Sequence, residues 1–142
     1  MWVWVNPIIM WLLKSPFHSL LSKGIVLVQV TGHKSGRSIS TPTAYLRDGN
    51  TLWVISRRES KWWRNARGGA KVSVLLAGKN LEGQGQVIED EEAVAHRLFE
   101  NLKIQPQRAR VAQVRLNESG LPIFADCERA AKTMLAVRID LP

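Results

Sequence analysis

The sequence is poor in cysteine, and this scarcity excludes two kinds of stabilisation. Cys127 is the single cysteine in 142 residues, so no disulfide bond can form within the chain. A lone cysteine fits a reducing compartment, which favours the cytoplasm, and it excludes a cysteine-based zinc site. The three histidines, at positions 18, 33 and 96, have no ligand spacing. We therefore predict that the protein holds no metal ion.

The sequence also lacks an apolar run long enough to cross a bilayer. Residues 1–13 are strongly apolar, but Pro7 interrupts them and Lys14 ends them, short of the ~20 residues that a spanning helix needs. They carry neither the basic start nor the cleavage site of a signal peptide. We predict an amphipathic helical segment over residues 1–23. Its apolar stripe either covers the core or makes a peripheral contact with the inner face of a membrane.

Acidic residues are scarce in one half of the chain only. Residues 1–71 hold 11 Lys and Arg but only Asp48 and Glu59 as acids, whereas residues 72–142 hold nine basic and ten acidic residues. The net charge of +8 therefore arises in the first half, and such a concentration of charge predicts an anionic partner. Nucleic acid is disfavoured as that partner, because the sequence carries no DNA- or RNA-binding signature.

The periodicity of the sequence is mainly that of β-strands. Asp48-Gly49-Asn50 is a typical hairpin turn, and Pro42 indicates an edge strand or a bulge. Helices are predicted over residues 59–67, with Ser60 as a cap, and from an Asp90 cap to about Leu102. Residues 128–132 are predicted to form either a short helix or a turn. Strands are predicted over residues 25–31, 39–47, 51–56, 71–77, 81–89 and 133–139.

This order of elements predicts the fold class. Hairpins come first, helices follow, and one last strand returns to the sheet. We expect an α+β, mainly β, fold in which a small β-barrel carries helices on its outside. No linker or repeat divides the chain, so residues 1–142 form a single domain.

The turn over residues 32–38 reads Gly-His-Lys-Ser-Gly-Arg-Ser. It is not the phosphate loop of nucleotide-binding proteins, because His33 stands where that loop needs a glycine and a strand follows in place of a helix. Two interpretations stay open. The turn is either a charged hairpin loop or an anion site, in which backbone N–H groups converge on an anion together with Lys34, Ser35, Arg37 and Ser38.

A second basic segment runs from Ser56 to Asn65 and contains two adjacent tryptophans. They would either stack on a planar ring or anchor a helix to the barrel, and we expect the second role for at least one of them. Trp62 and Trp63 would point about 100° apart on a helix, so they cannot fill one pocket equally. Tyr45 and Ser56 are the side chains near the basic turn that can donate a proton.

Four segments, taken in order, resemble a known family. They are Val-Thr-Gly-His-Lys-Ser-Gly-Arg, Thr-Pro-Thr-Ala-Tyr-Leu-Arg-Asp-Gly, Val-Ile-Ser-Arg and Trp-Trp-Arg-Asn. With them the chain resembles the deazaflavin-dependent nitroreductases of the flavin/deazaflavin oxidoreductase superfamily, over residues 6–90. The resemblance implies a split β-barrel like that of FMN-binding proteins. It also implies coenzyme F-420, a deazaflavin with a phosphate and an oligoglutamate tail, with FMN as the alternative cofactor.

The resemblance further implies which residues bind the cofactor. The basic turn would bind its phosphate, the Thr-Pro-Thr segment would lie along its ring, and the strand end and the following helix would complete the site. These residues are Lys34, Ser35, Gly36, Arg37 and Ser38 in the turn; Thr41, Pro42 and Thr43; Ser56, Arg57 and Arg58; and Trp62 and Asn65.

Together these expectations predict an F-420-dependent oxidoreductase. It would transfer a hydride between the deazaflavin and an electrophilic small molecule such as an activated alkene, a quinone or a nitro compound. Tyr45, Ser56 or solvent would supply the proton. The alternative is a non-catalytic carrier protein for F-420 or FMN, and assembly as a homodimer stays open.

Overall fold

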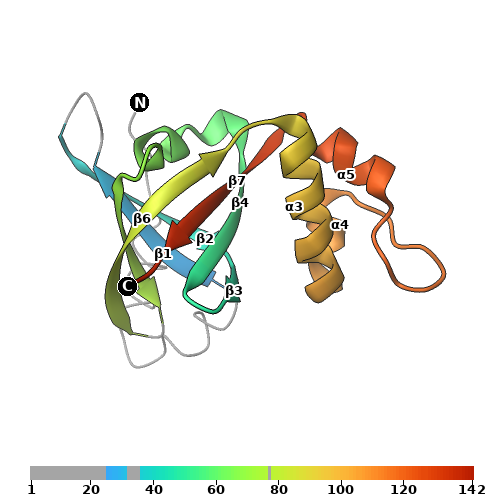
Figure 1. Cartoon of the computed structure of the whole chain (residues 1–142), viewed down its shortest axis with the longest axis horizontal. Helices are drawn as coiled ribbons and strands as arrows, with labels where there is room; N and C mark the ends of the chain where they lie inside the picture. Colours follow the sequence, from blue (N-terminus) through green and yellow to red (C-terminus); the bar gives the residue numbers. More distant parts are fainter. Residues whose placement is uncertain (1–24, 32–35, 77) are drawn as a thin grey trace.

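The computed structural model describes residues 25–31, 36–76 and 78–142. The predicted segment 1–23, His33, Lys34 and Ser35 lie outside these residues. One antiparallel sheet runs through the described chain in the strand order β2-β1-β5-β6-β7-β4-β3 (Figure 1). Its strands are β1 (Ile25–Thr31), β2 (Ser38–Ala44), β3 (Leu46–Asp48), β4 (Thr51–Arg57), β5 (Lys71–Leu76), β6 (Lys79–Ile88) and β7 (Met134–Asp140).

The main helices form one excursion between β6 and β7, and they lie together beside the sheet (Figure 1). Asp90 caps the first of them as predicted, because its carboxylate accepts a hydrogen bond of 3.0 Å from the N–H of Ala93. The helix or turn predicted over residues 128–132 is a helix in a shifted position: it begins at Phe124 and ends at Ala130. The helical elements are η1 (Arg58–Ser60), η2 (Trp62–Ala66), α3 (Glu91–Ile104), η3 (Pro106–Arg108), α4 (Ala109–Ala112) and α5 (Phe124–Ala130).

The two ends of the sheet belong to one continuous stretch of chain. β2 and β3 stand at opposite ends of the strand order, yet only Tyr45 separates them. The stretch can pair with β1 on one side and β4 on the other only if the sheet curls, which produces the expected half-barrel. The prediction of one unbroken strand over 39–47 was wrong at Tyr45, because the backbone changes partner there. Pro42 lies on the end strand β2, so the edge prediction is confirmed.

The segment after β4 is not the single helix that the sequence predicted. It forms two short 3₁₀ turns, separated by Lys61 in the left-handed region at φ 65°. Ser60 caps neither turn; its hydroxyl donates to the carbonyl of Arg57 at 2.8 Å. Trp62 and Trp63 are both buried, at 3% and 5% exposure, which confirms that at least one of them anchors this segment to the core.

The helical excursion is held together by one buried carboxylate. Asp126 is 2% exposed, and its oxygens accept hydrogen bonds from the backbone and guanidinium of Arg115 and from the guanidinium of Arg129. Hydrogen bonds from Arg115 are the main reason why the pKa of Asp126 lies well below its usual range. The long connection between α4 and α5 is thereby tied to α5.

Candidate active site

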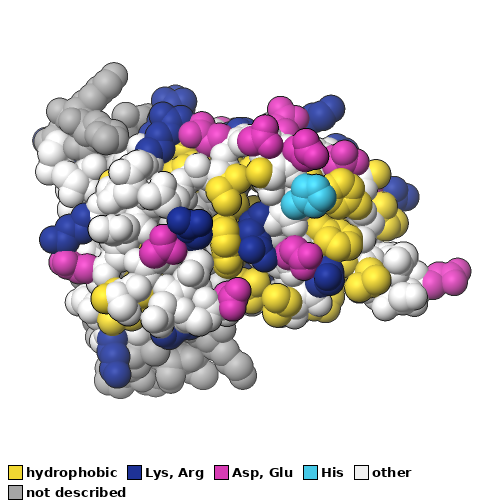
Figure 2. All heavy atoms as spheres, viewed as in Figure 1, with side chains coloured by type: hydrophobic (Ala, Val, Ile, Leu, Met, Phe, Trp, Pro, Cys, Tyr) yellow, Lys and Arg dark blue, Asp and Glu magenta, His cyan; other side chains and the backbone are white. Residues whose placement is uncertain are grey.

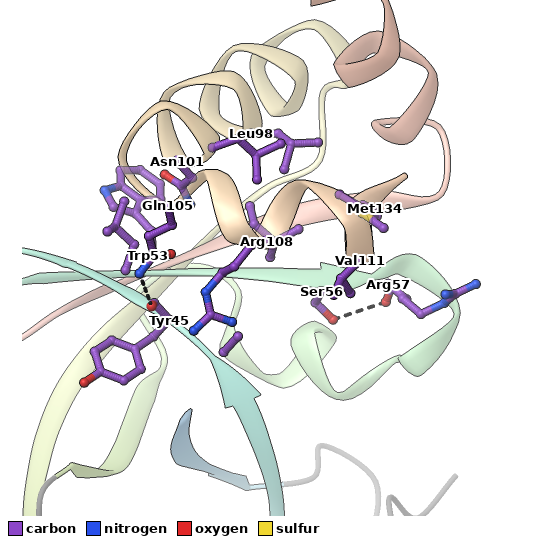
Figure 3. A pocket seen from close by; sticks show the side chains of 15 residues that line it. Tyr45, Trp53, Ser56, Arg57, Leu98, Asn101, Gln105, Arg108, Val111 and Met134 are labelled. Atoms are coloured by element: carbon purple, nitrogen blue, oxygen red, sulfur yellow. Dashed lines mark hydrogen bonds between the residues drawn. The ribbon is translucent and has the colours of Figure 1, made fainter. Parts of the chain in front are cut away.

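A cavity of about 200 Å³ lies between β4 and the helices α3, η3 and α4 (Figure 3). Its walls are mostly apolar, and no acidic residue of the described part of the chain lines it. The apolar lining consists of Ala44, Leu46, Trp53, Ile55, Leu98, Leu102, Val111, Ala112 and Met134. The polar lining consists of Tyr45, Ser56, Arg57, Asn101, Gln105 and Arg108. A planar organic ring is the kind of ligand that such a lining accommodates.

The two faces of β4 contribute differently to this cavity. Side chains alternate along a strand, so Trp53, Ile55 and Arg57 share one face, and all three line the cavity. The opposite face carries Leu52 and Val54, which are fully buried in the barrel core. Arg57 is 67% exposed and forms an ion pair of 2.9 Å with an equally exposed partner, Glu59. A pair this exposed contributes little, which leaves Arg57 available to an anionic ligand.

Ser56 borders the cavity but lies on the inner side of β4. Its hydroxyl accepts a hydrogen bond of 3.0 Å from the indole N–H of Trp62. The same oxygen lies 3.0 Å from the Ser60 hydroxyl and 3.2 Å from the carbonyl of Arg57, to which it can donate. This arrangement brings together two residues that the sequence predicted separately, Ser56 and Trp62, through a direct hydrogen bond.

Tyr45 lies where the barrel segment bends. Its carbonyl accepts a hydrogen bond of 3.4 Å from the side chain of Gln105, which ties the bend to the end of α3 (Figure 3). The aromatic ring extends away from α3 in this view. The two predicted proton donors, Tyr45 and Ser56, therefore border one cavity, while their hydroxyl groups are not directed to its centre.

The predicted ring-binding residues lie where β2 and β4 part. Continuing the antiparallel register of β3 and β4 past Tyr45 would set Thr43 opposite Ser56 and Pro42 opposite Arg57. Instead β2 takes β1 as its hydrogen-bonded partner along its whole length, from Ala44 to Ser38, although it stays in contact with β4. β2 and β4 are thus in contact without forming a ladder.

The described part of the basic turn is open to solvent. Gly36, Arg37 and Ser38 are all exposed, and Gly36 has a left-handed backbone at φ 65°, with no atom of the described residues within 4 Å of the place of a Cβ. A ligand can therefore approach the backbone closely at this glycine.

Two predicted cofactor residues have structural partners. The guanidinium of Arg58 donates to the carbonyls of Glu89, at 2.7 Å, and Ala131, at 3.0 Å, and so joins the start of the helical excursion to its end. Asn65 donates from its side-chain amide to the carbonyl of Trp62 at 3.3 Å. Neither Arg58 nor Asn65 lines the cavity, and their contact with a cofactor stays a prediction.

Three polar residues of the cavity were missed by the sequence analysis. Asn101, Gln105 and Arg108 come from the end of α3 and from η3. Residues 106–115 gave no clear periodicity; Pro106, which starts η3, was the available sign of a helical turn. Asn101 is buried at 6% exposure and accepts a hydrogen bond of 3.1 Å from Arg97. The guanidinium of Arg97 also lies over the Trp53 ring, 4.3 Å from its centroid, and so fixes this wall of the cavity.

Neither a metal cluster nor a spanning helix is found in the described residues. Residues 25–31, 36–76 and 78–142 contain no group of three His, Cys, Asp or Glu side chains placed to hold a metal ion. Within the same ranges, no helix has the length and apolarity to cross a membrane.

The curled sheet with flanking helices places the protein in the class of split β-barrels related to FMN-binding proteins, as expected. A putative pyridoxamine 5'-phosphate oxidase from Listeria innocua is similar, with a TM-score of 0.54, 16% identity, and 91% of this chain and 93% of that chain covered. An FAD and heme binding protein from Mycobacterium smegmatis is similar with a TM-score of 0.56 and 18% identity, and the match covers 91% of this chain and 67% of that chain. An F-420-H(2)-dependent reductase (FDR-A) is similar with a TM-score of 0.54 and 17% identity, and the match covers 83% of this chain and 95% of that chain.

The chain belongs to the F-420H(2)-dependent quinone reductase family, whose model matches residues 16–128. The protein is therefore an oxidoreductase whose cofactor is coenzyme F-420, as the resemblance implied. No curated protein matches the sequence.

Proposed function

We propose that the protein passes a hydride from reduced F-420 to a quinone held in the cavity between β4 and α3. The observation that supports this most strongly is the location of Arg57. This residue lines the apolar cavity, and it is also the last residue of β4, whose end is predicted to bind the cofactor. One strand end would then contact both reactants. A ring compound without a strong positive charge suits a cavity that has apolar walls and no acidic residue.

The described residues fit the chemistry of F-420. The segment 41–43, on the end strand β2, would hold the deazaflavin ring. Gly36, Arg37 and Ser38, together with Lys34 and Ser35, would hold the phosphate, and Arg57 would attract the carboxylates of the tail. Each exposed cation contributes only about 0–1 kcal/mol, so affinity requires several acting together. When bound and reduced, the deazaflavin supplies the hydride, and the protein contributes orientation and charge.

Ser56 is our preferred source of the proton, ahead of Tyr45. The Ser60 hydroxyl already donates a hydrogen bond to the Arg57 carbonyl at 2.8 Å. The Ser56 hydroxyl can therefore rotate toward another acceptor, and that carbonyl keeps a hydrogen bond. The Trp62 N–H would stabilise the Ser56 oxygen while its proton is shared with the acceptor. Tyr45 would act through its backbone, by fixing the bend and the position of Gln105.

The first test is a fluorescence titration of the purified protein with F-420, run beside FMN. We expect F-420 to bind more tightly, and Arg57→Ala to weaken its binding by up to about 5-fold, the effect of one partly exposed ion pair. Gln84→Ala, on the exposed side of β6, is the matched control. Preferential binding of FMN would contradict the proposal.

The second test is turnover with reduced F-420 and three acceptors: a naphthoquinone, an activated alkene and a nitroaromatic compound. We expect the quinone to give the highest kcat/KM. Ser56→Ala should lower kcat by about 10²-fold or more, in the range of general acid–base catalysis, and Tyr45→Phe much less. Faster reduction of the alkene or the nitro compound would overturn the proposed acceptor class.

A further inference from the structure

We propose that Arg108 is the acceptor-binding residue of the cavity and makes it selective for rings on which an oxygen carries, or develops during the reaction, a negative charge. This inference rests on the proposed function, because it takes the cavity as the acceptor site. It assigns the recognition of the acceptor to the helical excursion, apart from the barrel motifs that would bind the cofactor.

The first step of the argument is the position of the guanidinium. Arg108 ends η3, directly before α4, and its side chain extends into the cavity between Tyr45 and Ser56 (Figure 3). Its Nε atom has no contact with solvent. The residue as a whole is partly buried, and it lines the same cavity as Tyr45 and Ser56, the two residues predicted to donate a proton.

The second step concerns charge. Among residues 25–31, 36–76 and 78–142, the cations that line the cavity are Arg57 and Arg108, and no carboxylate of these ranges lines it with them. Arg57 is mostly exposed and paired with Glu59 at the surface, so solvent screens its field. The charge of Arg108 acts in a space with apolar walls, where its attraction for an anionic oxygen is stronger. The guanidinium has five N–H donors, so it can keep existing contacts and still bind an acceptor oxygen.

The third step is the chemistry of the acceptor. Reduced F-420 would supply the hydride by breaking one ring C–H bond, so that it loses two electrons and one proton. The hydride would form a new O–H bond at one quinone oxygen, and the displaced electron pair would rest on the opposite oxygen as an aryloxide. One further proton, from solvent or from Ser56 with replacement from solvent, would complete the hydroquinone. An N–H donor fixed beside that oxygen binds the developing charge more strongly than the neutral carbonyl. Arg108 has the charge and the position for this role.

The first readout needs no cofactor and uses two redox-inert ligands with the same ring, 2-naphthoate and 2-naphthamide. Binding is measured by calorimetry with the full chain. We expect Arg108→Met to weaken 2-naphthoate binding by about 10-fold to 100-fold, as for a hydrogen bond to a charged group, and to change 2-naphthamide binding by less than about 3-fold. Arg108→Lys, which keeps the charge, should fall between Met and wild type. The control Arg110→Met removes an exposed neighbour outside the cavity and should change neither affinity.

The second readout is steady-state turnover of a naphthoquinone with reduced F-420. Arg108→Met should lower kcat/KM by about 10-fold or more, while the affinity for F-420 measured by fluorescence stays unchanged. Melting temperatures show whether each variant folds. If the Met variant is unfolded, Arg108→Gln and Arg108→Lys carry the comparison.

Different results would contradict the role of Arg108 and the proposed reduction of quinones. Equal effects of Arg108→Met on the acid and the amide, or no effect on either, would overturn the role of Arg108, even if the wild-type protein reduces quinones. Conversely, Arg108-dependent binding of 2-naphthoate without quinone turnover would contradict the proposed function and leave the anion-binding role of Arg108 in place.

Discussion

The barrel strands and the helical excursion between β6 and β7 contribute to the site in different ways. The residues expected to bind the cofactor come from one stretch of the chain, residues 34–65. The acceptor cavity needs α3, η3 and α4 as its second wall. Apolar side chains of the excursion belong to the same buried core as those of the strands. The excursion adds polar contacts: Arg58 binds the carbonyls at its two ends, and Asp126 joins Arg115 and Arg129 within it.

This difference suggests a division of tasks. The strands and the turns after β4 carry the described residues expected to bind the cofactor, and the excursion supplies the second wall of the cavity. Hydrophobic side chains gather over the region of α3 and α5 (Figure 2), where Phe124 packs against Phe99 and His96. Phe99 and Phe124 also pack against the core that the excursion shares with the barrel. Separate changes in the two regions should have separable effects.

The largest effect is expected from Gly85→Ala in the barrel. A Cβ at this position would lie 2.4 Å from the carbonyl oxygen of Ala66 and 3.0 Å from Val72, so the η2 backbone has to move. We expect a loss of about 1–3 kcal/mol in the free energy of unfolding, measured by urea denaturation. The control is Gln84→Ala, at the exposed neighbouring position; equal stability of the two variants would contradict tight packing of η2 on β6.

A smaller and more local effect is expected from Asp126→Asn in the excursion. The substitution removes the negative charge that Arg115 and Arg129 share but keeps an oxygen for the backbone N–H of Arg115. Hydrogen exchange should become faster over residues 113–130 and stay unchanged in β4 and β7. Equal loosening of the barrel strands would show that the two regions unfold as one unit.

The same carboxylate makes the stability depend on pH. The pKa of Asp126 is lowered in the folded protein, chiefly by hydrogen bonds from Arg115. Its contribution is therefore complete above the unfolded pKa, about 4, and is lost as the pH falls below 4 toward the folded value. The difference in melting temperature between wild type and Asp126→Asn should be constant above about pH 5 and shrink below pH 4. A difference that does not change between pH 6 and pH 3 would contradict this assignment.

The smallest effect is expected from Glu89→Gln, at the junction of the two regions. Its carboxylate pairs with Arg67 at 2.8 Å, with side chains 40% and 50% exposed. Such a pair contributes about 0–1 kcal/mol and weakens with salt. The carbonyl of Glu89, which binds Arg58, is kept in this variant. A large loss of stability that salt does not reduce would mean that the junction is more important than its exposure indicates.

The barrel could be predicted from the sequence because its elements are coded locally. Residues 25–31 and 51–56 are apolar, β-branched runs bounded by turns, and both appear as strands. The break at Tyr45 could not be predicted, because it depends on which strand pairs with each half of the segment. The split at Lys61 likewise depends on the burial of both tryptophans, which a helical wheel does not anticipate.

The residues of the candidate site could likewise be predicted only in part, while the contacts between them depend on tertiary packing. Tyr45, Ser56 and Arg57 were predicted and do line one cavity. The hydrogen bond of Trp62 to Ser56 and the carbonyl contacts of Arg58 were not predicted, since they join residues whose approach depends on the packing of η2 and the excursion. Arg108 carried no motif, because a cation on a short turn acquires a role only from the surface that the turn faces.

The sequence by itself determined the strands, their hairpins, the basic first half and, through four short segments, the family and its cofactor. These features depend on neighbours in the chain, on side-chain periodicity and on composition. Only the tertiary structure decided that the chain bends at Tyr45, that Ser56 faces the core while Arg57 faces the cavity, and that Arg108 completes the cavity wall. The reason is physical: a cavity is bounded by surfaces from distant segments, and their approach is set by the packing of the whole chain.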